Sequence, residues 1–294
     1  MCPTCGSSST SGGTTSTGVL RKRRSTASRT SRRSFTAGGC ISFTSAVAQC
    51  RRAEHSGYGF SDAAEDGVLF HVGDMWQELM TDILGYDRFA AHGGDWGSFV
   101  TEVMARDHGR SVIGIRLTDV PFYHTVQKPD DPTKDEQTFL AEIERFPQTQ
   151  GAYALVQGTQ PQALALGLND SPAGLAGWII EKFRRWSDCD GDVEKAFTRD
   201  ELLANVMLYW VTRTINSSFA PYFDVTHAGA RTWIGQKIKE WTSRSSVPAG
   251  FAMFPKDLSS PPREWAERFF DVRRWTEMPG RSLCGARATR AARG

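Results

Sequence analysis

Hydrophobic positions follow two different spacings over most of the chain. The apolar runs at 89–91 and 112–117 have the length of buried strands, whereas those at 75–84 and 99–104 recur with the period of a helix. Gly85 marks the end of the first of these helices. The alternation of strand and helix predicts an α/β fold with a mostly parallel sheet.

The pattern changes in the middle of the chain, where helical spacing replaces the alternation. Amphipathic segments at 175–186 and 200–215 predict helices, the second of them capped by Thr198. Further along, the strand and helix patterns return, at 249–254, 263–269 and 272–275. The α/β unit is therefore expected to resume after a helical insertion.

The two ends of the chain differ in composition from the part between them. Residues 1–55 hold 20 Ser or Thr, nine Lys or Arg and one acid, and residues 281–294 hold four Arg and no acid. Subtracting their charges of +8 and +4 from the overall +2 leaves −10 for the residues between. We therefore expect 1–55 to be a disordered flank and 281–294 a tail, with an α/β core at 56–138 and 229–280 interrupted by a helical lid at 139–228.

A glycine-rich turn stands between the strand at 89–91 and the helix at 99–104. It reads Gly-Gly-Asp-Trp-Gly over 93–97. A strand that turns sharply into a helix needs strained backbone angles and close approach, which glycine tolerates. The pattern predicts a nucleophile elbow with Asp95 as the nucleophile, although an ordinary turn with Asp95 as an N-cap also fits. A carboxylate nucleophile suits attack on an sp3 carbon, because it forms an ester that is then hydrolysed.

Other candidate sites are weaker. Cys2 and Cys5 lack a second cysteine pair at zinc-site spacing, and the acidic loop at 188–192 misplaces the glycine of a calcium loop, so no metal is expected. The basic run at 21–24 could belong to a nucleic-acid-binding arm, but a solvated flank is the favoured interpretation and no nucleic-acid partner is expected. No apolar run reaches the length of a membrane span, and no signal peptide is evident, so we expect a cytoplasmic protein. The pattern does not indicate an oligomeric state.

Three further stretches, at 151–161, 169–176 and 247–257, together with the elbow, closely resemble the microsomal-type epoxide hydrolases. The resemblance extends over about 57–279. It implies an α/β-hydrolase fold with a helical lid, and hydrolysis of a small apolar epoxide to a vicinal diol without metal or organic cofactor.

The resemblance also implies roles for individual residues. Asp95 opens the epoxide as nucleophile, Tyr153 and Tyr222 protonate its oxygen, the Trp96 backbone N–H serves the oxyanion hole, and Asp257 is the acid of a His–acid pair. From the residues alone, the tyrosines are also typical of aromatic packing, and Asp257 of a turn or cap.

Two rival functions remain open. A haloalkane dehalogenase also places Trp after an aspartate nucleophile, although the tyrosine pair and the long lid match disfavour it. The second rival is a non-catalytic hydrolase fragment with a basic flank.

The resemblance predicts a histidine-bearing loop that the chain lacks. The family's loop reads GGHFAALExPELLA, but no histidine follows His227, and an Arg-rich stretch follows Pro279. Advancing the reading frame of the codons for 280–286 by one base admits Gly-Gly-His-Phe-Ala-Ala, with the histidine straddling Ser282 and Leu283. We expect that the tail is this loop read out of frame.

The N-terminal flank shows a similar anomaly. In the other reading frame, the codons of residues 5–45 admit strings that resemble the family's N-terminal segment. Between Ser45 and Gly57 the family has several tens of residues, including two strands and the HGWPG loop with a second oxyanion N–H, where this chain has eleven. We therefore expect an internal deletion, unpaired sheet edges and a chain that does not turn over.

Overall fold

The computed structural model describes residues 41–44, 50–53, 56–62, 71–126, 128–227, 235–237, 239–241 and 243–280. The expectations for 281–294, including the histidine near Ser282 and Leu283, and those for most of 1–55 lie outside these residues.

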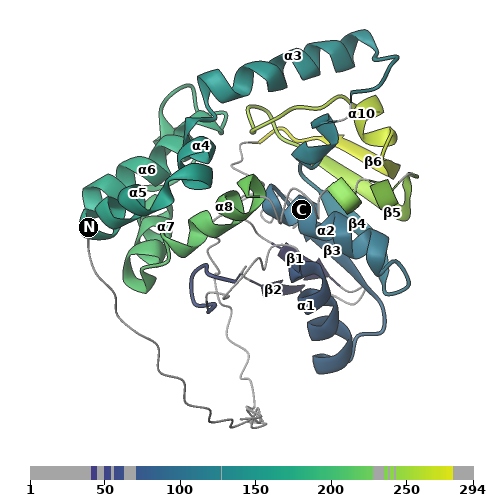
Figure 1. Cartoon of the computed structure of the whole chain (residues 1–294), viewed down its shortest axis with the longest axis horizontal. Coiled ribbons are helices and arrows are strands. Elements are labelled where there is room, and N and C mark those ends of the chain that lie inside the picture. Colours follow the sequence, from purple (N-terminus) through teal and green to yellow (C-terminus); the bar gives the residue numbers. More distant parts are fainter. Residues whose placement is uncertain are drawn as a thin grey trace, which may run out of the picture. The chain divides into compact units, whose positions relative to one another are not determined.

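A six-stranded sheet carries the fold, with the order β2-β1-β3-β4-β5-β6 (Figure 1). Its strands are β1 (Ile41–Thr44), β2 (Cys50–Ala53), β3 (Phe89–Gly93), β4 (Val112–Leu117), β5 (Ser245–Met253) and β6 (Phe270–Glu277). From β3 to β6 neighbouring strands are parallel. The predicted α/β class and the strands expected at 89–91, 112–117, 249–254 and 272–275 are confirmed.

Three short helical segments accompany the sheet. They are α1 (Val72–Glu78), which continues into a π-helical turn at Leu79–Ile83, α2 (Trp96–Asp107) and α10 (Arg263–Glu267). Helix α2 packs on β3, β4 and β5. Its residues Val100 and Met104, fully buried, contribute to one hydrophobic core with Phe89, Leu117 and Trp265. Strand β3, before the elbow, and helix α2, after it, are therefore packed into the same core.

The insertion between β4 and β5 is helical, as predicted. It contains α3 (Lys134–Thr149), α4 (Ala152–Thr159), α5 (Pro161–Asp170), α6 (Pro172–Arg185), α7 (Arg199–Thr212) and α8 (Ala220–Thr226). Thr198 caps α7 through a capping box with Glu201, which confirms the expected cap. A second hydrophobic core lies within these helices and includes Leu175, Val206 and Phe219. The helical insertion thus has packing of its own.

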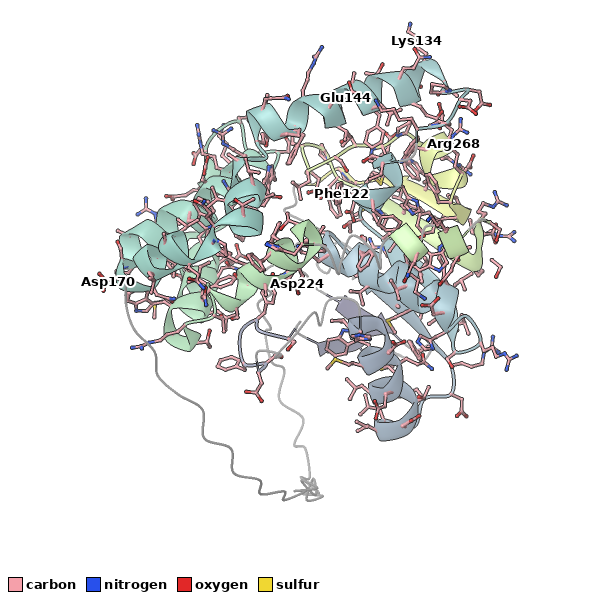
Figure 2. All side chains as sticks on the ribbon, in the orientation of Figure 1. Phe122, Lys134, Glu144, Asp170, Asp224 and Arg268 are labelled. Carbon is pink, nitrogen blue, oxygen red and sulfur yellow. The ribbon has the colours of Figure 1, made fainter. Side chains whose placement is uncertain are left out.

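Helix α3, the first helix of the insertion, contacts the α/β core through an ion pair and a packed aromatic pair. Arg268, after α10, forms a two-pronged ion pair with Glu136 in the first turn of α3, at 2.6 Å from Nε and 2.8 Å from Nη2. Figure 2 labels Arg268 and Lys134, the first residue of α3. The ring centroids of Phe139, on α3, and Trp265, on α10, lie 5.6 Å apart. Helix α3 begins at Lys134, earlier than the lid boundary expected at 139, and it packs on the core.

One expectation about the flank is wrong. Residues 1–55 were expected to be disordered, yet Ile41–Thr44 and Cys50–Ala53 form an antiparallel pair, and β1 also pairs antiparallel with β3. The hydrogen bonds of β1 occupy the edge of β3 that would otherwise be open. These short strands lack a sustained apolar pattern, so the pairing of β1 with β3, and of β2 with β1, determines their conformation rather than local sequence.

None of the helices in the described ranges combines the length and the hydropathy that a membrane crossing requires.

Candidate active site

Three aspartates follow the carboxyl ends of three neighbouring strands. Asp95 follows β3, Asp119 follows β4 and Asp257 follows β5. Because these strands are parallel and adjacent, their carboxyl ends meet at one edge of the sheet, where ligands of α/β proteins bind. The predicted residues Asp95 and Asp257 are therefore brought to the same edge, together with a carboxyl group that the sequence analysis did not single out.

The turn at Asp95 has the strained backbone of a nucleophile elbow. Asp95 has φ 55° and ψ −124°, in the positive-φ region that residues with a side chain rarely adopt. Gly93 accommodates this turn, since a Cβ atom there would lie 2.0 Å from the Gly97 carbonyl oxygen. Asp95 is the N-cap residue of α2 by position, but its side chain makes no capping hydrogen bond, unlike an ordinary N-cap aspartate. Strain of this kind is concentrated at functional sites.

The carboxyl group of Asp95 is partly buried at the start of α2. Burial raises its pKa to about 6, and a hydrogen bond from the Trp96 backbone N–H acts in the opposite direction. Asp95 is therefore ionised at neutral pH but poorly solvated, as suits a nucleophile. The Trp96 N–H thus contacts the carboxyl group, and its oxyanion role stays a prediction.

Asp119 contacts the elbow directly. Its Oδ1 atom accepts a hydrogen bond from the Asp95 backbone N–H at 3.2 Å and a second, short one from the Ser98 hydroxyl. Burial raises the pKa of Asp119 to about 8; the charges of Asp95 and Asp257 add to the rise, and the hydrogen bond from Ser98 opposes it. A signal for Asp119 was present in the sequence, because it comes directly after a predicted buried strand.

The two predicted tyrosines meet above the elbow residues. The rings of Tyr153 on α4 and Tyr222 on α8 lie edge to face with centroids 5.7 Å apart, and Tyr222 meets the Trp96 ring at 5.3 Å. Burial raises the pKa of Tyr222 well above its usual value, and the nearby Tyr153 and Asp95 raise it further. Tyr222 is thus protonated at neutral pH and within electrostatic reach of Asp95.

Close contact between α4 and α8 brings these tyrosines together. A Cβ atom at Gly158 would lie 2.6 Å from Cγ2 of Thr226 and 3.2 Å from the Tyr222 carbonyl oxygen. The Thr226 hydroxyl donates a short hydrogen bond to the Gly158 carbonyl oxygen. Only a residue without a side chain permits this approach.

Tyr153 has a cationic neighbour, Lys182. The Lys182 ammonium lies 5.4 Å from the Tyr153 ring centroid and 5.0 Å from that of Trp178. Trp186 packs on Tyr153 from another side, at 5.2 Å. The ring of Tyr153 is therefore fixed by aromatic and cation–π contacts.

Asp257 lies in the turn after β5, next to Lys256, which has φ 62°. Its Oδ1 atom accepts a hydrogen bond from the Leu258 backbone N–H at 2.8 Å, as the turn alternative expects. It also lies close enough to Asp119 to raise that group's pKa. Asp257 is thus at the site edge as well as part of a turn.

Several histidines of the described residues are engaged elsewhere. His108 lies 2.7 Å from Asp74, and His227 contacts the Phe223 carbonyl oxygen at 2.6 Å. His124 lies 2.9 Å from the buried carboxylate of Glu102. The partners of these three histidines are therefore Asp74, the Phe223 carbonyl group and Glu102.

The Glu102 carboxylate is the centre of a buried polar cluster about two turns along α2 from the elbow. It accepts hydrogen bonds from Arg106 at 2.7 Å, from His124 and, over a short distance, from the Tyr123 hydroxyl. Burial alone would raise the pKa of Glu102, but His124, Arg106 and Tyr123 together hold it below its usual value. The cluster fixes α2 to the loop after β4.

Comparison with known proteins agrees with this geometry. No family model matches the chain. The chain is 35% identical over 227 residues to a putative epoxide hydrolase of Stigmatella aurantiaca, covering 76% of this chain and 49% of that protein. It is 32% identical over 233 residues to epoxide hydrolase 1 of Sus scrofa, covering 72% of this chain and 50% of that protein. The chain therefore spans about half the length of the curated relatives it matches.

Solved structures give the same result. The structure of Aspergillus niger epoxide hydrolase matches with a TM-score of 0.64 at 25% identity, covering 80% of this chain and 59% of that chain. Juvenile hormone epoxide hydrolase of Bombyx mori matches with a TM-score of 0.59 at 25% identity, covering 77% of this chain and 52% of that chain. With the strained aspartate elbow and the helical insertion, these matches show that the chain belongs to the epoxide hydrolase family and has an α/β-hydrolase fold.

Proposed function

We propose that this chain carries the ring-opening half of epoxide hydrolysis and stops at the ester. The observation that carries the proposal is the strained, partly buried Asp95 beneath the Tyr153–Tyr222 pair. A carboxylate nucleophile and two phenol donors are the groups that ring opening requires, because an epoxide oxygen leaves as an alkoxide unless it is protonated.

In the proposed step, an Asp95 carboxylate oxygen attacks one ring carbon and the C–O bond to that carbon breaks. The bonding electrons pass to the epoxide oxygen, which takes a proton from Tyr153 or Tyr222. The products are a 2-hydroxyalkyl ester on Asp95 and a tyrosinate. The charge that began on Asp95 thus ends on a phenolate oxygen, and no metal or organic cofactor takes part.

The second half-reaction requires a base that activates water against the ester. Asp257 supports such a base as its acid partner, but the sequence holds no histidine after His227. We therefore expect the ester to accumulate. We also propose that the tail is the family's histidine loop translated in another reading frame, because of a one-base shift in the codons near Pro279.

The test is incubation of the full chain with styrene oxide, an epoxide with one apolar substituent. Intact-protein and peptide mass spectrometry should show one covalent adduct on Asp95, and none in Asp95→Asn. Asp87→Asn, which changes an exposed aspartate in the turn before β3, should form the adduct like the wild type. Sustained formation of the diol by the chain as given would contradict the proposed arrest.

The dehalogenase alternative has a separate readout. An aspartate nucleophile also displaces halide from a haloalkane, and that reaction needs no proton donor. Chloride release from 1-chlorobutane, with no adduct from styrene oxide, would favour it.

The remaining expectations stay predictions. They are a cytoplasmic location, the absence of a nucleic-acid partner and the disordered state of the outer flanks.

A further inference from the structure

The backbone N–H of Asp95 does not belong to a strand or a helix hydrogen bond. Asp95 stands between β3 and α2, and its N–H donates to neither element. The acceptor is a side chain, the Asp119 carboxyl group, at 3.2 Å. A buried backbone N–H without an acceptor costs about 1–3 kcal/mol, so this bond bears on the stability of the elbow.

The same carboxyl oxygen also accepts a hydrogen bond from the Ser98 hydroxyl. The Ser98 hydroxyl oxygen lies 3.2 Å from the Gly93 carbonyl oxygen. Ser98 is fully buried in the first turn of α2. Asp119 therefore contacts the elbow at the nucleophile itself and at the helix that follows it. In addition, the backbone N–H of Thr118 donates to the Gly93 carbonyl oxygen at 3.3 Å, so the end of β4 contacts both sides of Asp95.

We propose that Asp119 is a positioning residue for the nucleophile, whose carboxyl oxygen holds the Asp95 N–H and the Ser98 hydroxyl and thereby keeps the strained elbow in its reactive geometry. The proposal rests on Asp95 being the nucleophile of the proposed function. It assigns Asp119 no bond to the substrate.

If Asp119 positions the nucleophile, its ionisation should change the rate of ester formation with pH, which a residue that only packs would not do. The groups that face Asp119 are Asp95 from the elbow, Ser98 from α2 and Asp257 from the turn after β5. With pKa values of about 6 for Asp95 and about 8 for Asp119, Asp95 is the member of this pair that carries the negative charge at pH 7. Above pH 8 Asp119 ionises next to Asp95.

Ring opening moves the negative charge from Asp95 to a tyrosine, away from Asp119. An ionised Asp119 therefore favours the step, and the rate of ester formation should rise by a factor of roughly three or more as the pH passes 8. This rise should follow a first one near pH 6, where Asp95 ionises. The high pKa of Tyr222 keeps that donor protonated throughout.

The experiment compares the full chain with its Asp119→Asn, Asp119→Ala and Asp87→Asn variants. Asparagine retains an oxygen acceptor but cannot ionise, whereas alanine removes the acceptor. Two readouts are measured: hydrogen exchange in peptides covering 89–100, and the rate of Asp95 alkylation by styrene oxide between pH 5 and 9.

We expect Asp119→Asn to keep the elbow amides protected and to alkylate at pH 7 within about threefold of the wild type, but to lose the rise near pH 8. Asp119→Ala should lose protection at 89–100 and slow alkylation by roughly ten- to a hundredfold. Asp87→Asn should match the wild type in both readouts.

The proposal is overturned if Asp119→Ala keeps both the elbow protection and the alkylation rate. It is also overturned if the rise near pH 8 persists in Asp119→Asn. If Asp119→Ala unfolds throughout, seen as exchange in helix α6 as well, the Asp119→Asn profile decides. If the wild type forms no adduct, the proposed function fails, and the exchange at 89–100 still tests whether Asp119 holds the elbow.

Discussion

The rings of Tyr153 and Tyr222 meet edge to face, with their centroids 5.7 Å apart. The two residues come from helices that are separated in the chain by α5, α6 and α7. Their meeting depends on the close approach of α4 and α8 at Gly158. The two rings therefore meet because two helices pack without an intervening side chain.

Removing either hydroxyl should slow ring opening without preventing it. We expect Tyr153→Phe and Tyr222→Phe each to slow ester formation on Asp95 about tenfold, and the double variant by roughly a hundredfold or more, since general acid catalysis contributes ~10²–10⁴. Single-turnover mass spectrometry measures these rates. Tyr86→Phe, at a half-buried tyrosine in the turn before β3, is the control. An unchanged rate in the double variant would remove the tyrosines from the mechanism.

A methyl group at Gly158 should separate the two helices. Since its Cβ would lie 2.6 Å from Thr226 Cγ2, Gly158→Ala should destabilise the chain by about 1–3 kcal/mol and slow ester formation. Gly167→Ala is the matched control, because no atom lies within 4 Å of its added Cβ, and it should stabilise α5 by about 0.5–1 kcal/mol. Urea unfolding compares the two, and equal stability of both variants would contradict the close-approach argument.

Neutralising the nucleophile should stabilise the fold. The folded-state pKa of Asp95, about 6, lies above its ordinary value of 3.8, so its contribution to stability is complete below pH 3.8 and is lost as the pH rises through 6. At pH 7, Asp95→Asn should therefore have a free energy of unfolding, measured with urea, about 2–3 kcal/mol higher than that of the wild type. The difference should disappear at pH 4. A constant difference at both pH values would indicate another cause.

The buried cluster behind the elbow should respond in the opposite direction. Because the pKa of Glu102 is lowered, its contribution to stability is present above its ordinary value of 4.5 and is lost as the pH falls through the folded-state value. Glu102→Gln should cost about 3–5 kcal/mol at pH 7, since it leaves Arg106 buried without its charge partner. Glu144→Gln, at an exposed ion pair with Lys128, should leave stability almost unchanged.

The reading-frame proposal predicts a recovered histidine. A gene version with one base restored near Pro279, and with the missing N-terminal loop supplied, should turn over styrene oxide to its diol. Replacing the recovered histidine by glutamine should return the protein to the trapped ester. Resequencing the coding DNA at both ends is the direct check, and an unaltered frame would contradict the proposal.

Much of the fold could be predicted because local patterns determine it. The strands β3 and β4, the capping box at Thr198 and the glycine turn around Asp95 all follow from spacing and residue type within a few positions. The roles of Tyr153, Tyr222 and Asp257 came from resemblance, because nothing in their immediate neighbours distinguishes a donor from a packed ring or an acid from a turn residue.

Other features depend on distant partners and were not predicted. The strands β1 and β2 have little apolar pattern of their own; β1 is defined by its pairing with β3, and β2 by its pairing with β1. Asp119 was overlooked because its importance lies in the acceptor it offers to the Asp95 N–H, which only the assembled sheet shows.

The position of the helical insertion also bears on how the sheet assembles. Strand β4 pairs with β5, so that Leu117 lies opposite Phe251 and the whole insertion forms a closed loop between them. For a flexible chain of that length, the length-dependent entropy of closing the loop costs about 4 kcal/mol. Since the helices have a core of their own around Leu175 and Phe219, an insertion that folds first brings its two ends together before β5 docks. Substitutions in that core should then slow refolding of the sheet, although they lie on helices far along the chain from its strands.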